Sequence, residues 1–171
     1  SPIIIKGETN AVTIDGYSTG TTPVFELQNV SWITIQDLTI RYGGRTTIRL
    51  GYDYSASNIV IQNCRLSGAN DSSANNPAAI TINKSSDNVY LQNNEIYNTT
   101  SGHGISLFSC GNVSITGNHI HDLKMQTGVV GQVQAILIKH KPYGVISIRN
   151  NWIHNVYSGF MCNLENSSIE N

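Results

Sequence analysis

Hydrophobic and polar residues alternate in short segments along the whole chain, and one such segment recurs. Two apolar residues flank a polar one, a polar pair rich in Asn follows, and a third apolar residue closes the unit. Alternation with a period of two predicts a β-strand, and the polar pair predicts a sharp corner before a second strand. The copies are WITIQDLTI (32–40), NIVIQNCRL (58–66), NVYLQNNEI (88–96), NVSITGNHI (112–120) and VISIRNNWI (145–153).

The spacing of the copies predicts a solenoid. The second apolar residue of successive copies is Ile35, Ile61, Leu91, Ile115 and Ile148, so the repeat length varies from 24 to 33 residues while the register stays fixed. Loops of different length inserted at one place in each turn produce this combination. A second series of period-two segments lies between the copies, and no segment has helical periodicity. We therefore predict an all-β parallel solenoid with three short strands in each coil.

The sequence of the repeat resembles that of a known family. Together with the opening PIIIKGETNAVTIDG and the segment GHGISLFSCGNVSITGNHIHDL, it is similar to the right-handed parallel β-helix repeat proteins of the pectin-lyase-like superfamily. The resemblance covers essentially the whole chain and implies a single right-handed parallel β-helix domain, 1–171, of about five to six coils. Because this superfamily includes polysaccharide lyases, glycoside hydrolases, uronate epimerases, phage tailspikes and adhesins, the resemblance specifies the fold more narrowly than the chemistry.

Both ends of the sequence fall within predicted strands, at 3–5 and at 167–171. A terminal coil without a cap would expose an edge strand and a hydrophobic cross-section. We therefore expect the chain to be a segment of a longer β-helix, or to associate end to end with another copy.

Composition and charge exclude several function classes. Charged residues make up only 12% of the chain and the net charge is -1, so the basic surface that binds a nucleic acid is not expected. The sequence has no apolar run long enough to span a membrane. The odd number of cysteines, 3, argues against a disulfide framework. Surfaces rich in Asn, Ser, Thr and Tyr instead suit neutral hydrogen bonding to sugars.

Two adjacent columns of residues are predicted at the corner of each repeat. Asn tolerates left-handed backbone conformations, and its amide both donates and accepts hydrogen bonds. We therefore predict a structural role for both columns, in stacked amide ladders. One column holds Asp37, Asn63, Asn93, Gly117 and Asn150, and the next holds Cys64, Asn94, Asn118 and Asn151.

The outward positions of the second strand series carry the densest mixture of charges. In the uronate lyases that the chain resembles, a Lys or Arg removes the proton next to a carboxylate, while a cation neutralises that carboxylate. The resemblance thus implies a catalytic group of Lys139, Arg49 and His140, in which Lys139 or Lys141 is the candidate base and Arg49 holds the substrate. The alternative is that KHKP, at 139–142, forms a solvated corner.

Aromatic and polar residues near these positions predict a sugar-binding surface. Tyr rings stack on sugar faces while their hydroxyls bond to ring substituents. Asp53 and Glu165 offer oxygen ligands to calcium, the one candidate cofactor, although four coils would separate them by about 19 Å. The predicted substrate-binding residues are Tyr52, Asp53, Tyr54, Asn83 and Lys141.

The histidines suggest a second grouping. His121 and His154 occupy the same repeat position in neighbouring coils, so they should stack about 5 Å apart, near Asp122. Two such imidazoles and a carboxylate could hold zinc. The position also suits exposed polar residues, however, because other copies place Arg41 and Tyr97 there, and no metal site is predicted.

Two function classes follow. The first is a carbohydrate-active domain that binds or processes an acidic polysaccharide by a lyase, hydrolase or epimerase type of reaction. The alternative is a non-catalytic extracellular or tail-fibre-like solenoid with a structural or adhesion role, so whether the chain is an enzyme stays open. The expected partner is a polysaccharide or oligosaccharide, with no nucleic acid and no membrane span, and the expected location is extracellular or at the cell surface.

Overall fold

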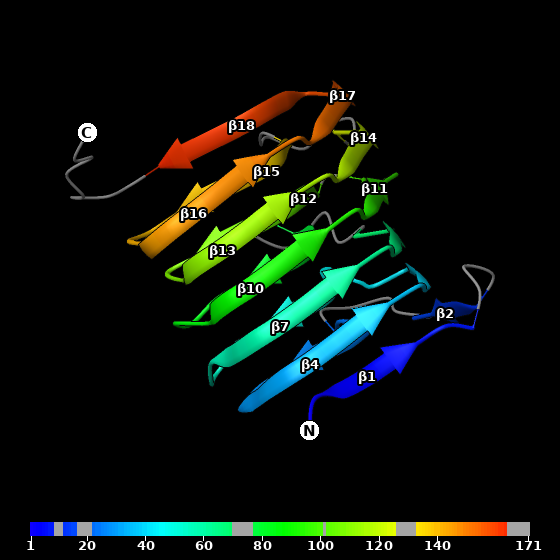
Figure 1. Cartoon of the computed structure of the whole chain (residues 1–171). Helices are drawn as coiled ribbons and strands as arrows, with labels where there is room; N and C mark the ends of the chain where they lie inside the picture. Colours follow the sequence, from blue (N-terminus) through cyan, green and yellow to red (C-terminus); the bar gives the residue numbers. More distant parts are fainter. Residues whose placement is uncertain (9–11, 17–21, 70–76, 101, 126–132, 164–171) are drawn as a thin grey trace.

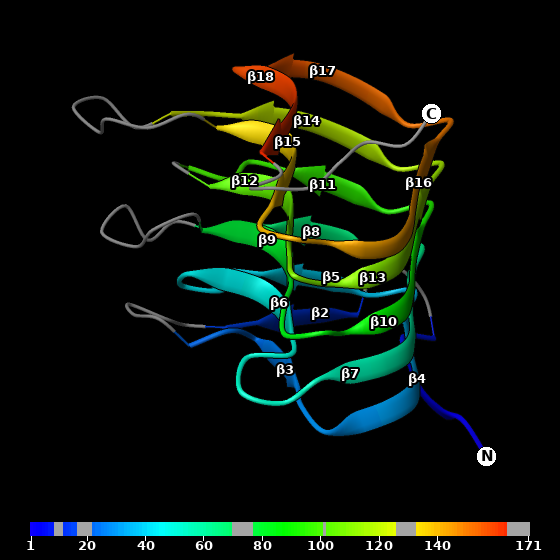
Figure 2. The ribbon, with the colours of Figure 1, turned by 90° about the vertical axis from the view of Figure 1, so that its left-hand side faces the viewer.

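Three parallel β-sheets wind around one core in the computed structural model of the chain (Figure 1). The structure describes residues 1–8, 12–16, 22–69, 77–100, 102–125 and 133–163, and these residues contain no helix. Each coil adds one strand to each sheet, so every sheet is 6-stranded and the coils stack one above the next (Figure 2). The predicted all-β parallel solenoid is confirmed. Accordingly, the described residues offer no helix that is long and apolar enough to cross a membrane.

Every strand pairs with the strand one coil away, because the chain returns to the same sheet after each turn. Sheet A contains β1 (Ile3–Lys6), β4 (Val30–Gln36), β7 (Ala56–Gln62), β10 (Asp87–Gln92), β13 (Gly111–Thr116) and β16 (Tyr143–Arg149). Sheet B contains β2 (Thr13–Asp15), β5 (Thr39–Arg41), β8 (Arg65–Ser67), β11 (Glu95–Tyr97), β14 (His119–Leu123) and β17 (Trp152–Val156). Sheet C contains β3 (Phe25–Leu27), β6 (Thr46–Leu50), β9 (Ala78–Ile82), β12 (His103–Phe108), β15 (Gln134–Lys139) and β18 (Ser158–Asn163).

The predicted register of the core is confirmed. Ile35 pairs with Ile61, Ile61 with Leu91, Leu91 with Ile115, and Ile115 with Ile148. The first four side chains are fully buried, and Ile148 is partly buried against the same core. Like side chains therefore stack on like through successive coils, and this column fixes the position of every outward residue.

Sheet C departs from the predicted pattern of exposure. Alternation places Ser106 and Leu137 on the outer side of this sheet, yet both are fully buried. The strands that carry them, β12 and β15, are buried at every position except the last. Alternation indicates which side of a sheet a residue faces, whereas burial depends on what covers that side. Outward-facing chemistry on sheet C is thus concentrated near the strand ends.

The two corner columns have different structural roles. The column with Asn94 and Asn118 points inward and is buried. Asn118 Nδ2 donates to the Leu91 carbonyl oxygen at 2.9 Å and to Asn151 Oδ1 at 3.0 Å, and Asn94 repeats the pattern one coil earlier. The adjacent column instead has left-handed backbone conformations, with φ between 52° and 70°. The structural role predicted for both columns is confirmed, but the amide ladder runs along the inner one.

Candidate functional site

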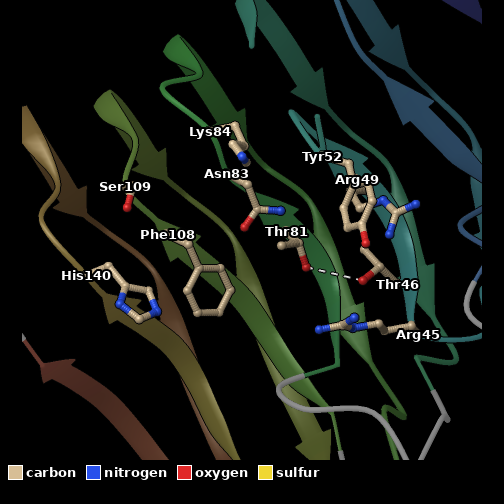
Figure 3. Close-up of a pocket in the computed structure, with 10 residues that line it drawn as sticks. All are labelled: Arg45, Thr46, Arg49, Tyr52, Thr81, Asn83, Lys84, Phe108, Ser109 and His140. Carbon is tan, nitrogen blue, oxygen red and sulfur yellow. Dashed lines mark hydrogen bonds between the residues drawn. The ribbon is translucent and has the colours of Figure 1, made fainter. Parts of the chain in front are cut away.

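A pocket of about 360 Å³ lies on the outer side of sheet C, near the ends of its strands (Figure 3). Its lining comes from four neighbouring coils. β6, β9, β12 and β15 contribute late strand positions or the residues that follow them, and Arg45 and Thr46 come from the start of β6. The ten lining residues are Arg45, Thr46, Arg49, Tyr52, Thr81, Asn83, Lys84, Phe108, Ser109 and His140.

Strand register and turn geometry position these side chains. Arg49 pairs with Thr81 of the next coil, and the hydroxyl oxygens of Thr46 and Thr81 lie 3.3 Å apart (Figure 3). After β9, β12 and β15 the chain turns through residues with positive φ, among them Lys84 at 51° and His140 at 59°. These left-handed residues lead the chain away from sheet C at the same level in successive coils. The solenoid therefore gathers residues far apart in sequence along one edge of the sheet.

The lining is positively charged. It includes Arg45, Arg49 and Lys84 together with the His140 imidazole, and none of the described lining residues is Asp or Glu. Arg49 is oriented by its surroundings: its Nη2 lies 2.7 Å from Glu26 Oε1, and its guanidinium carbon lies 4.1 Å from the centre of the Tyr52 ring. Such a lining favours an anionic ligand, because planar guanidinium groups bind carboxylates through paired hydrogen bonds.

Aromatic rings and neutral polar groups complete the pocket. Tyr52, which is 47% exposed, lies beside Arg49, while Phe108 and His140 lie next to one another further along (Figure 3). The rings of Phe108 and His140 are 5.8 Å apart and tilted by 39°. Asn83 lies between them and offers an amide, and Thr46 adds a hydroxyl to the lining (Figure 3). Aromatic faces combined with a few hydrogen-bonding groups are typical of sites that bind sugars.

Four of the eight predicted site residues line this pocket: Arg49, Tyr52, Asn83 and His140. Their roles stay predictions. The other four lie outside the lining. Lys139, the predicted base, is the last residue of β15 and pairs with Phe108 and Asn163 of the neighbouring coils, while Asp53, Tyr54 and Lys141 are exposed.

Sequence reasoning missed Arg45, Lys84 and Phe108 as site residues. The register carried a signal for two of them, because Phe108 occupies the same strand-end level as Asn83 and Lys139, and Lys84 occupies the next level, with His140. Arg45 precedes β6 and lies outside the alternating pattern, so only the folded chain brings it to the pocket.

The donor set of the pocket does not suit calcium. Calcium prefers six to eight oxygen ligands and commonly uses carboxylates, whereas the described lining offers hydroxyls, one amide and several cations. Asp53 lies outside the lining, and Glu165 lies outside the described residues. Calcium binding at Asp53 stays a prediction, and no step of the proposal below depends on it.

Two of the three described thiols do not suit nucleophilic chemistry. Cys64, Cys110 and Cys162 are free, and the first two are buried. Burial raises the pKa of Cys64 to about 11 and that of Cys110 to about 12. A thiol attacks as its thiolate, so these two groups are inert near neutral pH.

Comparison with known proteins identifies the family. The family model described as "Right handed beta helix region" matches residues 3–171. The chain belongs to this right-handed β-helix family. No curated protein matches the sequence. Among solved structures, a rhamnogalacturonan lyase superposes on this β-helix with a TM-score of 0.59 at 11% identity, covering 95% of this chain and 53% of the lyase.

A double mutant of a periplasmic alginate epimerase gives a TM-score of 0.35 at 15% identity, covering 82% of this chain and 44% of that protein. The chain therefore spans about half the length of the lyase and less than half that of the epimerase. At 11% identity, the likeness to the lyase shows the fold alone.

Proposed function

We propose that the pocket on sheet C binds an acidic sugar unit of a polysaccharide. The observation that carries this proposal is the lining: two arginines, a lysine and an imidazole, with aromatic rings beside them and no Asp or Glu among the described lining residues. A uronate has a carboxylate that suits the cations and a pyranose ring that suits the aromatic faces. The pocket volume, about 360 Å³, lies within the range that is usual for small-ligand sites.

Arg49 is the principal carboxylate ligand in this proposal. Glu26 and the Tyr52 ring already hold its guanidinium, so little side-chain entropy is lost when a ligand binds. Glu26 also neutralises part of the charge of Arg49, and Arg45 and Lys84 are further cations in the lining. Because Lys84 lies in the coil next to that of Arg45 and Arg49, about 4.8 Å away, an extended polymer can cross the coils and contact cations in both.

The fold supports carbohydrate as the ligand class, since the rhamnogalacturonan lyase with the same architecture acts, by its name, on a polysaccharide. An extracellular or cell-surface location would suit such a ligand and belongs to the proposal. The proposal concerns binding. Turnover is a separate question, because the predicted base Lys139 lies outside the pocket lining.

Calorimetric titration with acidic oligosaccharides tests the proposal. Oligogalacturonate and oligoalginate should bind with micromolar to millimolar dissociation constants, because one pocket buries little of a polymer. The carboxyl-reduced forms of the same oligosaccharides should bind at least about tenfold more weakly, since they lack the anion. Unsaturated products, detected by their ultraviolet absorbance, would add lyase activity to binding.

Arg49→Gln combined with Arg45→Gln should abolish the binding and leave the melting temperature nearly unchanged. Arg41→Gln is the matched control: Arg41 is also paired with a carboxylate, Asp15, at 2.6 Å, and it also lies over a ring, that of Tyr42, at 5.2 Å, but on sheet B. Equal binding of acidic and carboxyl-reduced sugars, or an equal loss in Arg41→Gln, would contradict the proposal. Absence of any binding would favour the structural solenoid.

A further inference from the structure

Three imidazoles gather on the outer face of sheet B, on a different sheet from the pocket. His119 and His121 belong to β14, and His154 belongs to β17. One ring nitrogen of each lies within 4.8 Å of a ring nitrogen of the other two. His119 Nε2 and His154 Nε2 lie 2.9 Å apart. All three side chains are only partly buried, so an ion from solution can reach them.

The β-helix register produces this triangle. β14 and β17 are parallel neighbours, with His119 opposite Trp152 and His121 opposite His154. Residues two apart on a strand face the same side, so one coil supplies two outward imidazoles and the next coil supplies the third. The predicted stacking of His121 on His154 is confirmed, with ring centroids 5.2 Å apart and planes 6° apart.

Neighbouring groups hold the three rings in place. His119 stacks on the Trp152 indole with centroids 4.2 Å apart and planes 6° apart, and His121 stacks on Tyr97 at 5.8 Å. His121 Nδ1 lies 2.8 Å from Asp122 Oδ2, and Asn155 Nδ2 donates to the other oxygen of that carboxylate at 3.2 Å. A ring nitrogen that donates to a carboxylate fixes the tautomer and makes the opposite nitrogen, here Nε2, the one that can bind a metal.

We propose that His119, His121 and His154 form a binding site for a divalent transition-metal ion, with Zn²⁺ as the representative. Zinc binds imidazole nitrogen at about 2.0–2.1 Å, so three nitrogens on one tetrahedral ion lie about 3.3 Å apart. The distances between the imidazole nitrogens, from 2.9 Å to at most 4.8 Å, span this value. Small side-chain rotations therefore suffice to bring all three nitrogens to one ion. Three protein ligands leave a fourth position for water or another ligand.

Two carboxylates border the three imidazoles, and one of them, that of Glu95, is also paired with Arg65. Glu95 Oε1 lies 3.3 Å from His121 Nε2, and Asp122 lies on the other side of the same ring. Burial and the neighbouring imidazoles of His121 and His154 lower the pKa of His119. Imidazole suits zinc, copper, nickel and iron better than it suits calcium or magnesium, so the ligand set selects the transition metals.

The test is calorimetric titration of the chain, stripped of metal and free of any polyhistidine tag, with Zn²⁺, together with Co²⁺ absorption as a report on coordination geometry. We expect one ion per chain and a visible Co²⁺ spectrum that Zn²⁺ abolishes. His119→Ala and His154→Ala should each weaken Zn²⁺ binding at least about 100-fold, and Asp122→Asn about tenfold, because a ligand or its orienting partner is lost.

Two controls separate a metal site from an aromatic stack. Trp152→Phe keeps all three imidazoles while changing the ring stacked on His119, so it should bind Zn²⁺ within about threefold of the parent. His140→Ala removes an imidazole from sheet C and should leave Zn²⁺ binding unchanged. In a Trp32→Phe background, Cu²⁺ should quench the fluorescence of Trp152, because this indole stacks on His119.

Circular dichroism establishes that each variant is folded, and His119→Gln and His154→Gln replace any alanine variant that is not. The proposal is overturned if the folded parent chain binds Zn²⁺ no more tightly than its His119 and His154 variants. It is also overturned if His140→Ala loses as much affinity as they do, or if Cu²⁺ leaves the Trp152 fluorescence unchanged. These outcomes are independent of carbohydrate binding, because they concern a different sheet and different residues.

Discussion

The outer faces of sheets B and C are built by the same stacking rule, but they arrange their charges differently. On sheet B, Arg41 pairs in register with Asp15 and Arg65 with Glu95, each at 2.6 Å from the neighbouring coil. On sheet C, Arg49 pairs with Glu26, and then the column continues through the uncharged Thr81. Cations therefore accumulate at the strand ends of sheet C, where none of the described pocket-lining residues is acidic.

This difference shows how a solenoid separates stability from function. The inward columns are alike in both sheets and bury the same kinds of side chain. Outward residues are free to vary, and each one lies about 4.8 Å from the residue at the same position in the next coil. Opposite charges placed in register neutralise one another, as on sheet B. Cations that gather in a lining with no acidic residue among those described favour an anionic ligand, as we propose for sheet C.

The largest expected effect concerns the buried corner column, which is part of the core that supports both outer faces. Asn118→Ala should lower the free energy of unfolding by about 3 kcal/mol, because it leaves the buried Leu91 carbonyl and the Asn94 main-chain N–H without their partners. Chemical denaturation measures this loss. Asn93→Gly is the control in the adjacent column, where φ is 53° and the side chain is exposed. It should cost less than about 1 kcal/mol, because Gly adopts positive φ without strain. Equal costs in both variants would contradict the distinction between the columns.

The second expected effect concerns the buried histidine of sheet C. His103 starts β12 in sheet C and is buried, and its Nδ1 accepts a hydrogen bond from the Gln134 main-chain N–H at 3.0 Å. Burial lowers the pKa of His103 from 6.5 to about 4. The unfolded chain thus takes up a proton near pH 6.5 that the folded chain takes up only near pH 4. The stabilisation is complete above pH 6.5 and is lost as the pH falls towards 4.

Between pH 7 and pH 5 this histidine should therefore cost about 2 kcal/mol of the free energy of unfolding. Chemical denaturation at the two pH values measures the loss, and His103→Gln, which keeps an acceptor but does not titrate, should remove most of it. A pH dependence of His103→Gln as steep as that of the parent would show that other groups cause the acid sensitivity.

His103 also shows which features of the structure the sequence pattern could not predict. The fold followed from the sequence because the apolar register of Ile35, Ile61 and Leu91 is fixed and the core must bury it. The burial of His103 did not follow, since alternation does not say which outer surfaces other segments cover. The alternating pattern also did not predict where residues in loops and turns, such as Arg45, would place their side chains.

The candidate site was predicted in part for the same reason. Arg49, Tyr52, Asn83 and His140 were found because they lie at strand ends, where the register still determines position. The histidine grouping was predicted as a stacked pair, His121 with His154, since equal repeat positions stack. The approach of His119 to His154 depends on side-chain rotamers across the diagonal of two strands, which the repeat does not specify.

The smallest expected effect tests the charge comparison itself. Lys84→Glu places a carboxylate among the cations of the pocket and should raise the free energy of unfolding by about 0.5 kcal/mol, while it weakens the binding of acidic sugars. Glu95→Lys on sheet B replaces the partner of Arg65 with a like charge and should lower the free energy of unfolding by about 0.5–1 kcal/mol. Thermal unfolding at low salt measures both shifts. At about 1 M salt the two should shrink together, because the screening length falls to about 3 Å. Shifts of the same sign at low salt would show that the two faces do not differ in charge balance, since only an unbalanced face gains from an added opposite charge.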